Sequence, residues 1–338
     1  MEKNEKTEKK IRYLCVCHGI SPKVKATLDE IPRRGGFYNW LFNFQGDIKP
    51  WKEVRGRDEL EQYDIVHCNM SPIDLAIIPQ IRRTLGRNSK TKLVVNNDYV
   101  AEVWYRWGFH PEQYWTVQGM ADMVFGTEPI QVSHMIDRAK VIPHPHWIHM
   151  LKKMRPDDTE KTYGILYHWW EGKVHSPAIF AQKLKKRLPY FKSKFYAYRE
   201  DVADDKRWMR AYFDFQVPPM GFPDYIDDLM SNYFVYEPTS FHTYGRNTVD
   251  LAAIGVPVIG SNTVESMRRC FPKTCCDPWD IRKTVEIAER LVKDKDFYRE
   301  VVEYAKEACE YYNYENSRKR FLKALEESKN ERKEYKYN

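Results

Sequence analysis

"PTSFHTYGRNTVDLAAIGVPVIGS", residues 238–261, is the stretch that decides the fold. A polar loop leads through Gly245 into an apolar helical segment, and a Gly-Val-Pro break separates that segment from a second apolar run. We expect Asn247 to cap the helix at its start and Gly255 to end it. This order of loop, helix and strand is typical of a parallel α/β sheet.

The start of this helix has the chemistry of a phosphate site. A helix start presents free N–H groups and a partial positive charge. Gly245 lets a ligand approach the backbone closely, and Arg246 adds a fixed cation. Asp250, one turn further on, can accept two hydrogen bonds from a ribose diol. These features together predict a phosphate or diphosphate site. The alternative is a capped helix whose Asp250 and Arg246 are solvated.

Short β-rich runs alternate with helical segments on either side of this stretch. Strands are predicted at 11–17, 63–69, 92–98, 123–126, 139–147, 163–169, 194–200, 233–239 and 256–262. Helices are predicted at 73–86, 176–189 and 222–232, and the chain is predicted to be helical from 277 to 330, with Asp280 as an N-cap. The segment 151–162 is charged and contains proline, which is the composition of a linker.

The alternation predicts two α/β domains in tandem, which a chain of 338 residues can form. The first is an N-terminal Rossmann-like domain, residues 1–152, and the second is a C-terminal Rossmann-like domain, residues 153–310. Residues 311–338 are predicted to form a C-terminal helix and a basic tail. The chain is 42% hydrophobic and 30% charged, which indicates a globular protein and excludes a disordered one.

Charge and cysteine content indicate which surfaces the chain can contact and in which redox compartment it is expected. The net charge is +7, and the Lys-rich ends carry part of it; we interpret these ends as solvated tails or as arms in weak contact with a polyanion or a membrane surface. The 7 cysteines are odd in number and lack metal-ligand spacing, so we expect reduced thiols in a cytoplasmic protein. No apolar signal segment or run of about 18 apolar residues is present.

The stretch 238–261 resembles the C-terminal signature of glycosyltransferase family 4, whose members have the GT-B fold. The matching residues are Pro238, Thr239, His242, Gly245, Asp250, Ala253, Gly255, Pro257, Val258 and Ile259. The segments 141–147, 165–176, 221–239 and 311–325 also resemble family segments in the same order, so the resemblance covers most of 118–326. It implies two Rossmann-like parallel-sheet domains that face a cleft and are closed by C-terminal helices.

The resemblance implies a metal-independent, retaining transferase that uses a UDP- or GDP-linked sugar and no cofactor. The second domain would bind the donor and the first domain the acceptor. Asp250 would hold the ribose, and the diphosphate would lie against Gly245, Arg246, Asn247 and Thr248. His168 and Lys173 match the basic pair that neutralises the leaving diphosphate.

Two matched positions differ from the family pattern. His242 stands where the family has the glutamate that contacts the donor sugar, and His168 stands where it has an arginine. Histidine carries a charge only part of the time near neutral pH. His168, Lys173 and His242 remain the candidate catalytic residues, and a non-catalytic sugar- or nucleotide-binding protein is the alternative.

Further candidates come from their places at strand ends and in a glycine loop. On the acceptor or cleft side they are His18, Gly19, Gly35, Gly36 and Asp98, and on the donor side they are Arg199 and Glu265. An ordinary turn or cap is the alternative for each. His144 and His146 are split by a proline and lack an adjacent carboxylate, so we expect them to line the hinge and bind no metal.

The predicted function is transfer of a sugar to an acceptor of unknown kind: a glycan, a lipid-linked molecule or DNA. A DNA-modifying glycosyltransferase that acts on a hydroxylated base is the second hypothesis, because the chain is basic and rich in aromatic residues.

Overall fold

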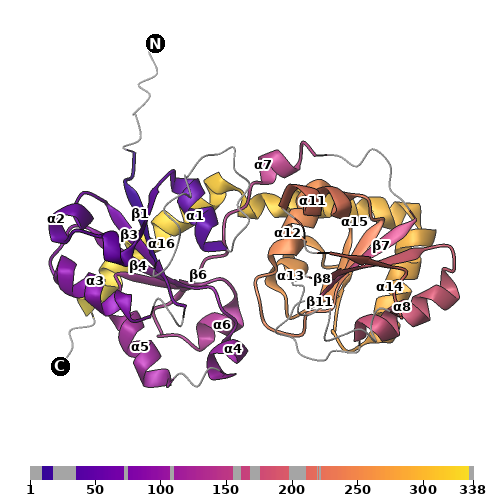
Figure 1. Ribbon diagram of the computed structural model, residues 1–338, viewed down its shortest axis with the longest axis horizontal. Helices are drawn as coiled ribbons and strands as arrows, with labels where there is room; N and C mark the ends of the chain where they lie inside the picture. Colours follow the sequence, from indigo (N-terminus) through magenta and orange to yellow (C-terminus); the bar gives the residue numbers. More distant parts are fainter. Residues whose placement is uncertain are drawn as a thin grey trace, which may run out of the picture.

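The computed structural model describes residues 10–17, 36–71, 75–106, 110–154, 161–167, 176–197, 211–218, 220 and 222–334. These residues form two lobes that lie side by side, each built around a parallel sheet of six strands (Figure 1). The predicted pair of Rossmann-like parallel-sheet domains, followed by C-terminal helices, is confirmed.

The first sheet has the strand order β2-β1-β3-β4-β5-β6, and every pairing is parallel. The strands are β1 (Tyr13–Cys17), β2 (Asp47–Pro50), β3 (Ile65–Asn69), β4 (Lys92–Asn97), β5 (Met123–Gly126) and β6 (Lys140–Val141). The sequence pattern did not predict β2, because this short edge strand is polar and lacks an apolar run. Between β1 and β3 the strand order changes direction.

Helices cover both faces of the first sheet. They are α1 (Gly36–Phe44), α2 (Arg57–Leu60), α3 (Ile77–Leu85), α4 (Ala101–Arg106), α5 (Pro111–Gly119) and α6 (Pro129–Ser133), with a 3-10 turn at Trp51–Glu53. One buried cluster joins Leu14 and Val95 of the sheet to Ile81 of α3. A second cluster, on the other face, joins Tyr13 and Phe125 to α1. The central strands therefore carry buried apolar residues on both faces, as is typical of a covered parallel sheet.

The second sheet has the order β12-β11-β10-β7-β8-β9, again with parallel pairings throughout. The strands are β7 (Thr162–Tyr167), β8 (Lys192–Ala197), β9 (Phe215–Val217), β10 (Phe234–Glu237), β11 (Val258–Ser261) and β12 (Cys275–Cys276). This is the order of the dinucleotide-binding Rossmann sheet, with its change of direction between β7 and β10. The loop 238–245 directly follows β10.

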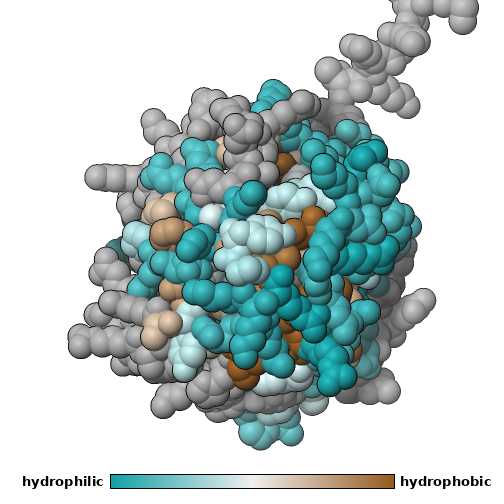
Figure 2. All heavy atoms as spheres, turned by 90° about the vertical axis from the view of Figure 1, so that its right-hand side faces the viewer, coloured by the Kyte–Doolittle hydropathy of each residue, from teal (hydrophilic) through white to brown (hydrophobic). Residues whose placement is uncertain are grey.

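The helices of the second lobe are α8 (Ser176–Arg187), α11 (Phe222–Met230), α12 (Arg246–Ile254), α13 (Glu265–Cys270), α14 (Ile281–Lys293) and α15 (Lys295–Ala308). Helix α14 begins as predicted, with the Asp280 side chain accepting a hydrogen bond from the Lys283 N–H. Its residues Val285, Ala288 and Leu291 are buried in the core. On the end of the molecule formed by this lobe, hydrophilic residues cover most of the described surface, with apolar residues showing between them (Figure 2).

The chain crosses between the lobes twice, and the two crossings lie next to each other. After β6 it passes through 142–147 into α7 (Ile148–Leu151), and it returns through a 3-10 turn at Cys309–Tyr312 into α16 (Tyr314–Glu334). The His146 N–H donates to the Tyr312 carbonyl at 2.7 Å, and His146 forms a parallel bridge with Asn313. Backbone hydrogen bonding thus joins the two crossings into one hinge.

Helix α16 carries the C-terminal segment back onto the first lobe (Figure 1). Its Phe321 is fully buried, with its ring centroid 4.9 Å from that of Trp40 and 5.2 Å from that of Phe44. The Arg318 Nε donates to the Asn43 side-chain oxygen at 3.0 Å. The last helix is therefore part of the first lobe's core. Across the described residues, no helix has the length and apolar character to cross a membrane.

Candidate functional site where the two sheets meet

The carboxyl ends of the two sheets face each other. Val100 and Val103, which follow β4, form a buried cluster with Phe241, which follows β10. Arg268 of α13 donates to Glu128, which follows β5, at 2.9 Å. Ligands of open parallel sheets bind outside the carboxyl ends of the strands, at the change of strand order. The region between these loops is therefore the candidate site.

Helix α12 starts at the change of strand order in the second sheet. Its N-cap is Gly245, with φ +80°, and Arg246 is its first residue. The predicted cap Asn247 is wrong, because Asn247 lies inside the first turn. The predicted end at Gly255 is confirmed, with φ +86° and its N–H bonded to the Leu251 carbonyl.

Two independent constraints require glycine at position 245. Its positive φ is a conformation that other residues rarely adopt. A Cβ there would also lie 2.1 Å from Val264 Cγ1 and 2.5 Å from Ser266 Oγ. The Ser266 hydroxyl donates to the Gly245 carbonyl at 2.7 Å. The loop before α12 is thus pressed against the start of α13, and this contact sets the direction of the helix start.

Asp250, the predicted ribose ligand, is buried beside the hinge. Its Oδ1 lies 2.9 Å from His146 Nδ1, and its Oδ2 lies 3.8 Å from Arg246 Nε. Burial lowers the pKa of His146, so its ring is neutral. A carboxylate only accepts hydrogen bonds, so His146 donates through Nδ1. His146 lies in the hinge as expected, but its contact with Asp250 was not predicted from the sequence.

The other donor-side candidates of the second lobe already have protein partners. The Thr248 hydroxyl donates to Glu237 at 2.6 Å, and both side chains are buried. The Glu265 carboxylate accepts from the Tyr312 hydroxyl at 2.6 Å and from Arg269 Nε at 3.0 Å. A donor hydroxyl would have to replace one of these bonds to reach Glu265. Thr248 can still offer its backbone at the first turn of α12.

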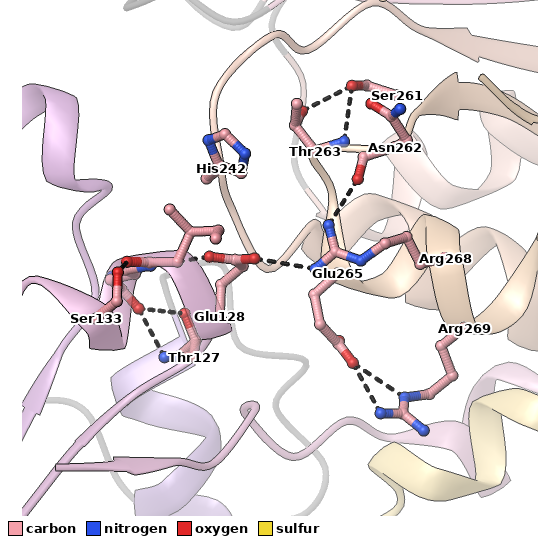
Figure 3. A network of polar contacts seen from close by, with 12 residues as sticks. Thr127, Glu128, Ser133, His242, Ser261, Asn262, Thr263, Glu265, Arg268 and Arg269 are labelled. Carbon is pink, nitrogen blue, oxygen red and sulfur yellow. Dashed lines mark hydrogen bonds and ion pairs between the residues drawn. The ribbon is translucent and has the colours of Figure 1, made fainter. Parts of the chain in front are cut away.

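His242 lies on the loop that follows β10 and faces the first lobe (Figure 3). Its side chain is 39% exposed, and its Nδ1 is 3.6 Å from a Glu102 carboxylate oxygen of α4. His242 thus contacts an acidic side chain of the first lobe from the loop of the second lobe. Its partial exposure leaves the ring accessible to a ligand.

Figure 3 also shows an ion pair between the lobes that the sequence did not predict. Arg268 donates to Glu128 at 2.9 Å and to the Asn262 carbonyl at 2.6 Å. Glu128 is fully buried and also caps α6 by accepting from the Gln131 N–H at 2.9 Å. Proline at the first position of a helix, here Pro129, is a readable signal of a helix start. The pairing of Glu128 with Arg268 depends on the tertiary fold.

On the first lobe, Asp98 follows β4 and its side chain contacts Nε2 of the buried His144 of the hinge segment. Deeper in the same sheet, His67 contacts the Tyr13 hydroxyl and lies 2.9 Å from Asn96 Oδ1. Burial lowers the pKa of His67 to about 3, so this ring is a neutral member of the core. Gly36 is the first residue of α1.

Several predicted site residues lie outside the described part of the chain: His18, Gly19, Gly35, His168, Lys173 and Arg199. In the sequence, His18 follows the last residue of β1 and His168 follows the last residue of β7. Among the residues that the structure describes, no group of three or more His, Cys, Asp or Glu side chains could hold a metal ion.

No known protein family and no curated protein matches this chain in sequence. Its fold does match solved structures. The alpha-glucosyltransferase AGT in complex with UDP gives a TM-score of 0.66 at 12% identity, covering 93% of this chain and 99% of AGT. The apo structure of OtsA gives 0.68 at 8% identity, with the same coverage of 93% and 99%.

A third similar structure is TarM of S. aureus, solved with Fondaparinux, alpha-GlcNAc-glycerol and UDP. It gives a TM-score of 0.60 at 13% identity and matches 77% of this chain, which spans only 55% of the TarM chain. Identities this low establish the fold alone. The two lobes, each with a six-stranded parallel sheet, and the C-terminal helices therefore form the GT-B-like fold of solved glycosyltransferase structures.

Proposed function

We propose that this chain is a retaining glycosyltransferase that moves a sugar from a nucleotide-diphosphate sugar to an acceptor. The observation that carries the proposal is the start of α12 directly behind Gly245, at the change of strand order between β7 and β10. Ligands of open parallel sheets bind at the change of strand order, and the free N–H groups of a helix start there favour a phosphate group. The UDP complexes of AGT and TarM support UDP as the carrier, with GDP as the alternative.

The second lobe would bind the donor. The backbone N–H groups at the first turn of α12 and the Arg246 guanidinium would contact the diphosphate, and Asp250 would contact the ribose. Departure of a nucleoside diphosphate builds negative charge, and cations already in place lower the barrier to that step. Lys173 and Arg246 carry such charge at neutral pH, and His168 adds it when protonated. His242 would face the sugar from the loop after β10.

Calorimetry with UDP, GDP and their sugar conjugates tests donor binding. We expect one nucleotide family to bind and Asp250→Asn to weaken that binding about tenfold, since a hydrogen bond to a charged group is lost. Asp296→Asn is the matched control, because the Asp296 side chain is 91% exposed and lies on α15. A wild-type chain that binds no nucleotide or nucleotide sugar would contradict the proposal.

Release of free nucleotide from the bound donor tests catalysis. We expect slow hydrolysis by the wild type in the absence of an acceptor and its loss in Lys173→Ala with the fold retained. Tight donor binding without turnover, for every conjugate and acceptor tried, would support a non-catalytic binding protein instead.

DNA is the second candidate acceptor. The alpha-glucosyltransferase in complex with UDP and a 13-mer DNA containing an HMU base matches 93% of this chain, and 99% of that chain, at a TM-score of 0.61. The net charge of +7 favours contact with a polyanion. A gel shift with hydroxymethylated and unmodified duplexes over rising salt tests this. We expect binding that weakens with salt. Absence of a shift at low salt would exclude DNA.

A further inference from the structure

The hinge carries a histidine whose position is fixed by the backbone on both sides. His146 bonds through its N–H to the Tyr312 carbonyl at 2.7 Å and forms a bridge with Asn313. The next residue, Trp147, is buried, with its ring centroid 5.4 Å from that of Phe42 and 5.8 Å from that of Tyr314. The backbone of His146 is therefore fixed within the hinge, and it can move only if the hinge moves with it.

The side chain of this histidine enters the second lobe. Its Nδ1 lies 2.9 Å from Asp250 Oδ1, and the two side chains are only 2% and 4% exposed. Its ring centroid lies 5.5 Å from that of Tyr244, whose hydroxyl donates to the His144 carbonyl at 3.0 Å. The backbone of His146 is thus bonded to Tyr312 and its ring packs against Tyr244, while its Nδ1 bonds to one oxygen of Asp250.

The second oxygen of Asp250 is in a different situation. Oδ2 is buried and has no hydrogen-bond partner among the described residues. Arg246 lies one helical turn away, with Nε 3.8 Å from Oδ2, and its side chain is 24% exposed. At that distance the contact is an ion pair without a hydrogen bond. Arg246 can leave it at a smaller cost than His146 can leave Oδ1.

We propose that His146 is a positioning residue for the donor site, and that it holds Asp250 in place while Oδ2 exchanges the Arg246 guanidinium for a ribose hydroxyl. The inference rests on the proposed function. Arg246 pairs with Asp250 while the site is empty and turns towards the diphosphate when a donor enters. Because Oδ1 stays bonded to His146, the carboxylate keeps its orientation during the exchange.

The test compares binding of a nucleotide with binding of its 2′,3′-dideoxy analogue, which lacks the ribose diol. In calorimetry, we expect His146→Leu to bind UDP about tenfold more weakly than the wild type. Its affinity for 2′,3′-dideoxy-UDP should stay within about twofold, because the diol contact is already absent there. GDP and 2′,3′-dideoxy-GDP replace this pair if the wild type prefers guanine.

Two polar variants keep the inference falsifiable if His146→Leu does not fold. His146→Asn places an N–H near the position of Nδ1 and should restore most of the UDP affinity. His146→Gln places its N–H near Nε2 and should behave like His146→Leu. Far-UV circular dichroism and the unfolding midpoint check that each variant is folded.

The outcomes separate the two proposals. An equal loss of affinity for UDP and its dideoxy analogue would show a general structural role and overturn the inference. The same conclusion follows if His146→Asn binds UDP no better than His146→Gln. A wild-type chain that binds neither UDP nor GDP would overturn the proposed function itself, and the inference with it.

Discussion

The two lobes build their polar sites in different ways. In the second lobe, Gly245, Arg246 and Asp250 lie within two turns at the start of one helix, after the loop that follows β10 at the change of strand order. In the first lobe, the buried polar chain draws Tyr13, His67 and Asn96 from three separate strands. A site whose residues are neighbours in the sequence can be predicted from a motif. A cluster whose residues come from several strands can be identified only from the folded structure.

The largest expected effect tests whether α16 belongs to the first lobe. We expect Phe321→Ala to lower the free energy of unfolding by about 4 kcal/mol, because it removes a fully buried ring from the aromatic cluster. Urea unfolding followed by tryptophan fluorescence measures this, since Trp40 contacts the ring. Lys323→Ala is the control on the same helix, with a side chain 79% exposed. Equal midpoints for the two variants would mean that α16 does not stabilise the lobe.

The next effect tests the local construction of the second lobe. We expect Gly245→Ala to cost about 3 kcal/mol, because a positive φ and a rigid clash with Val264 act together. Gly255→Ala also has a positive φ, but its added Cβ would meet the flexible end of Lys306. We expect a cost of about 1 kcal/mol there. Chemical denaturation of both variants measures the difference, and equal costs would refute the packing argument.

The first lobe should respond to pH through His67. Its folded pKa of about 3 is below that of an unfolded histidine, so the unfolded chain binds more protons between these two values. The stability that neutral, buried His67 contributes is fully present above about pH 6.5. As the pH falls below that value, the free energy of unfolding decreases by up to about 1.4 kcal/mol per pH unit. Urea unfolding of the wild type and His67→Asn from pH 7 to 4.5 measures it. We expect a flatter profile in the variant, and parallel profiles would contradict the assignment.

The smallest effect concerns the ion pair that joins the lobes. A double-mutant cycle with Glu128→Gln and Arg268→Ala should give a coupling of about 1 kcal/mol, since Glu128 is fully buried but the Arg268 side chain is 38% exposed. The control cycle uses the exposed pair Arg299 and Asp296 of α15, for which we expect no measurable coupling. Zero coupling at Glu128 would mean that the lobes are held together by the hinge and apolar contacts.

Much of the fold was predictable because its signals are local. Apolar runs marked β1, β3, β4 and β5 of the first sheet and β7, β8, β10 and β11 of the second. Gly255 and Asp280 ended and began helices where expected. The Asn247 cap was wrong because Gly245 can take the left-handed conformation directly before the helix. The edge strand β2 was not predicted because its pairing with β1, not its composition, makes it a strand.

The contacts between segments that lie far apart along the chain could not be read from the sequence. His146 and Asp250 are 104 positions apart, Glu128 and Arg268 are 140 apart, and Asn43 and Arg318 are 275 apart. None of these pairs follows a helical or strand period, so no pattern in the chain links them.

The sequence by itself determined the two parallel α/β sheets and the glycine-led start of α12, because backbone preference and apolar periodicity act within a few residues. The tertiary structure decided which partners these elements meet. It placed α16 in the core of the first lobe, and it gave Asp250 a histidine from the hinge. The physical reason is that burial and hydrogen bonding depend on which surfaces the folded chain brings together, and those surfaces lie far apart along the sequence.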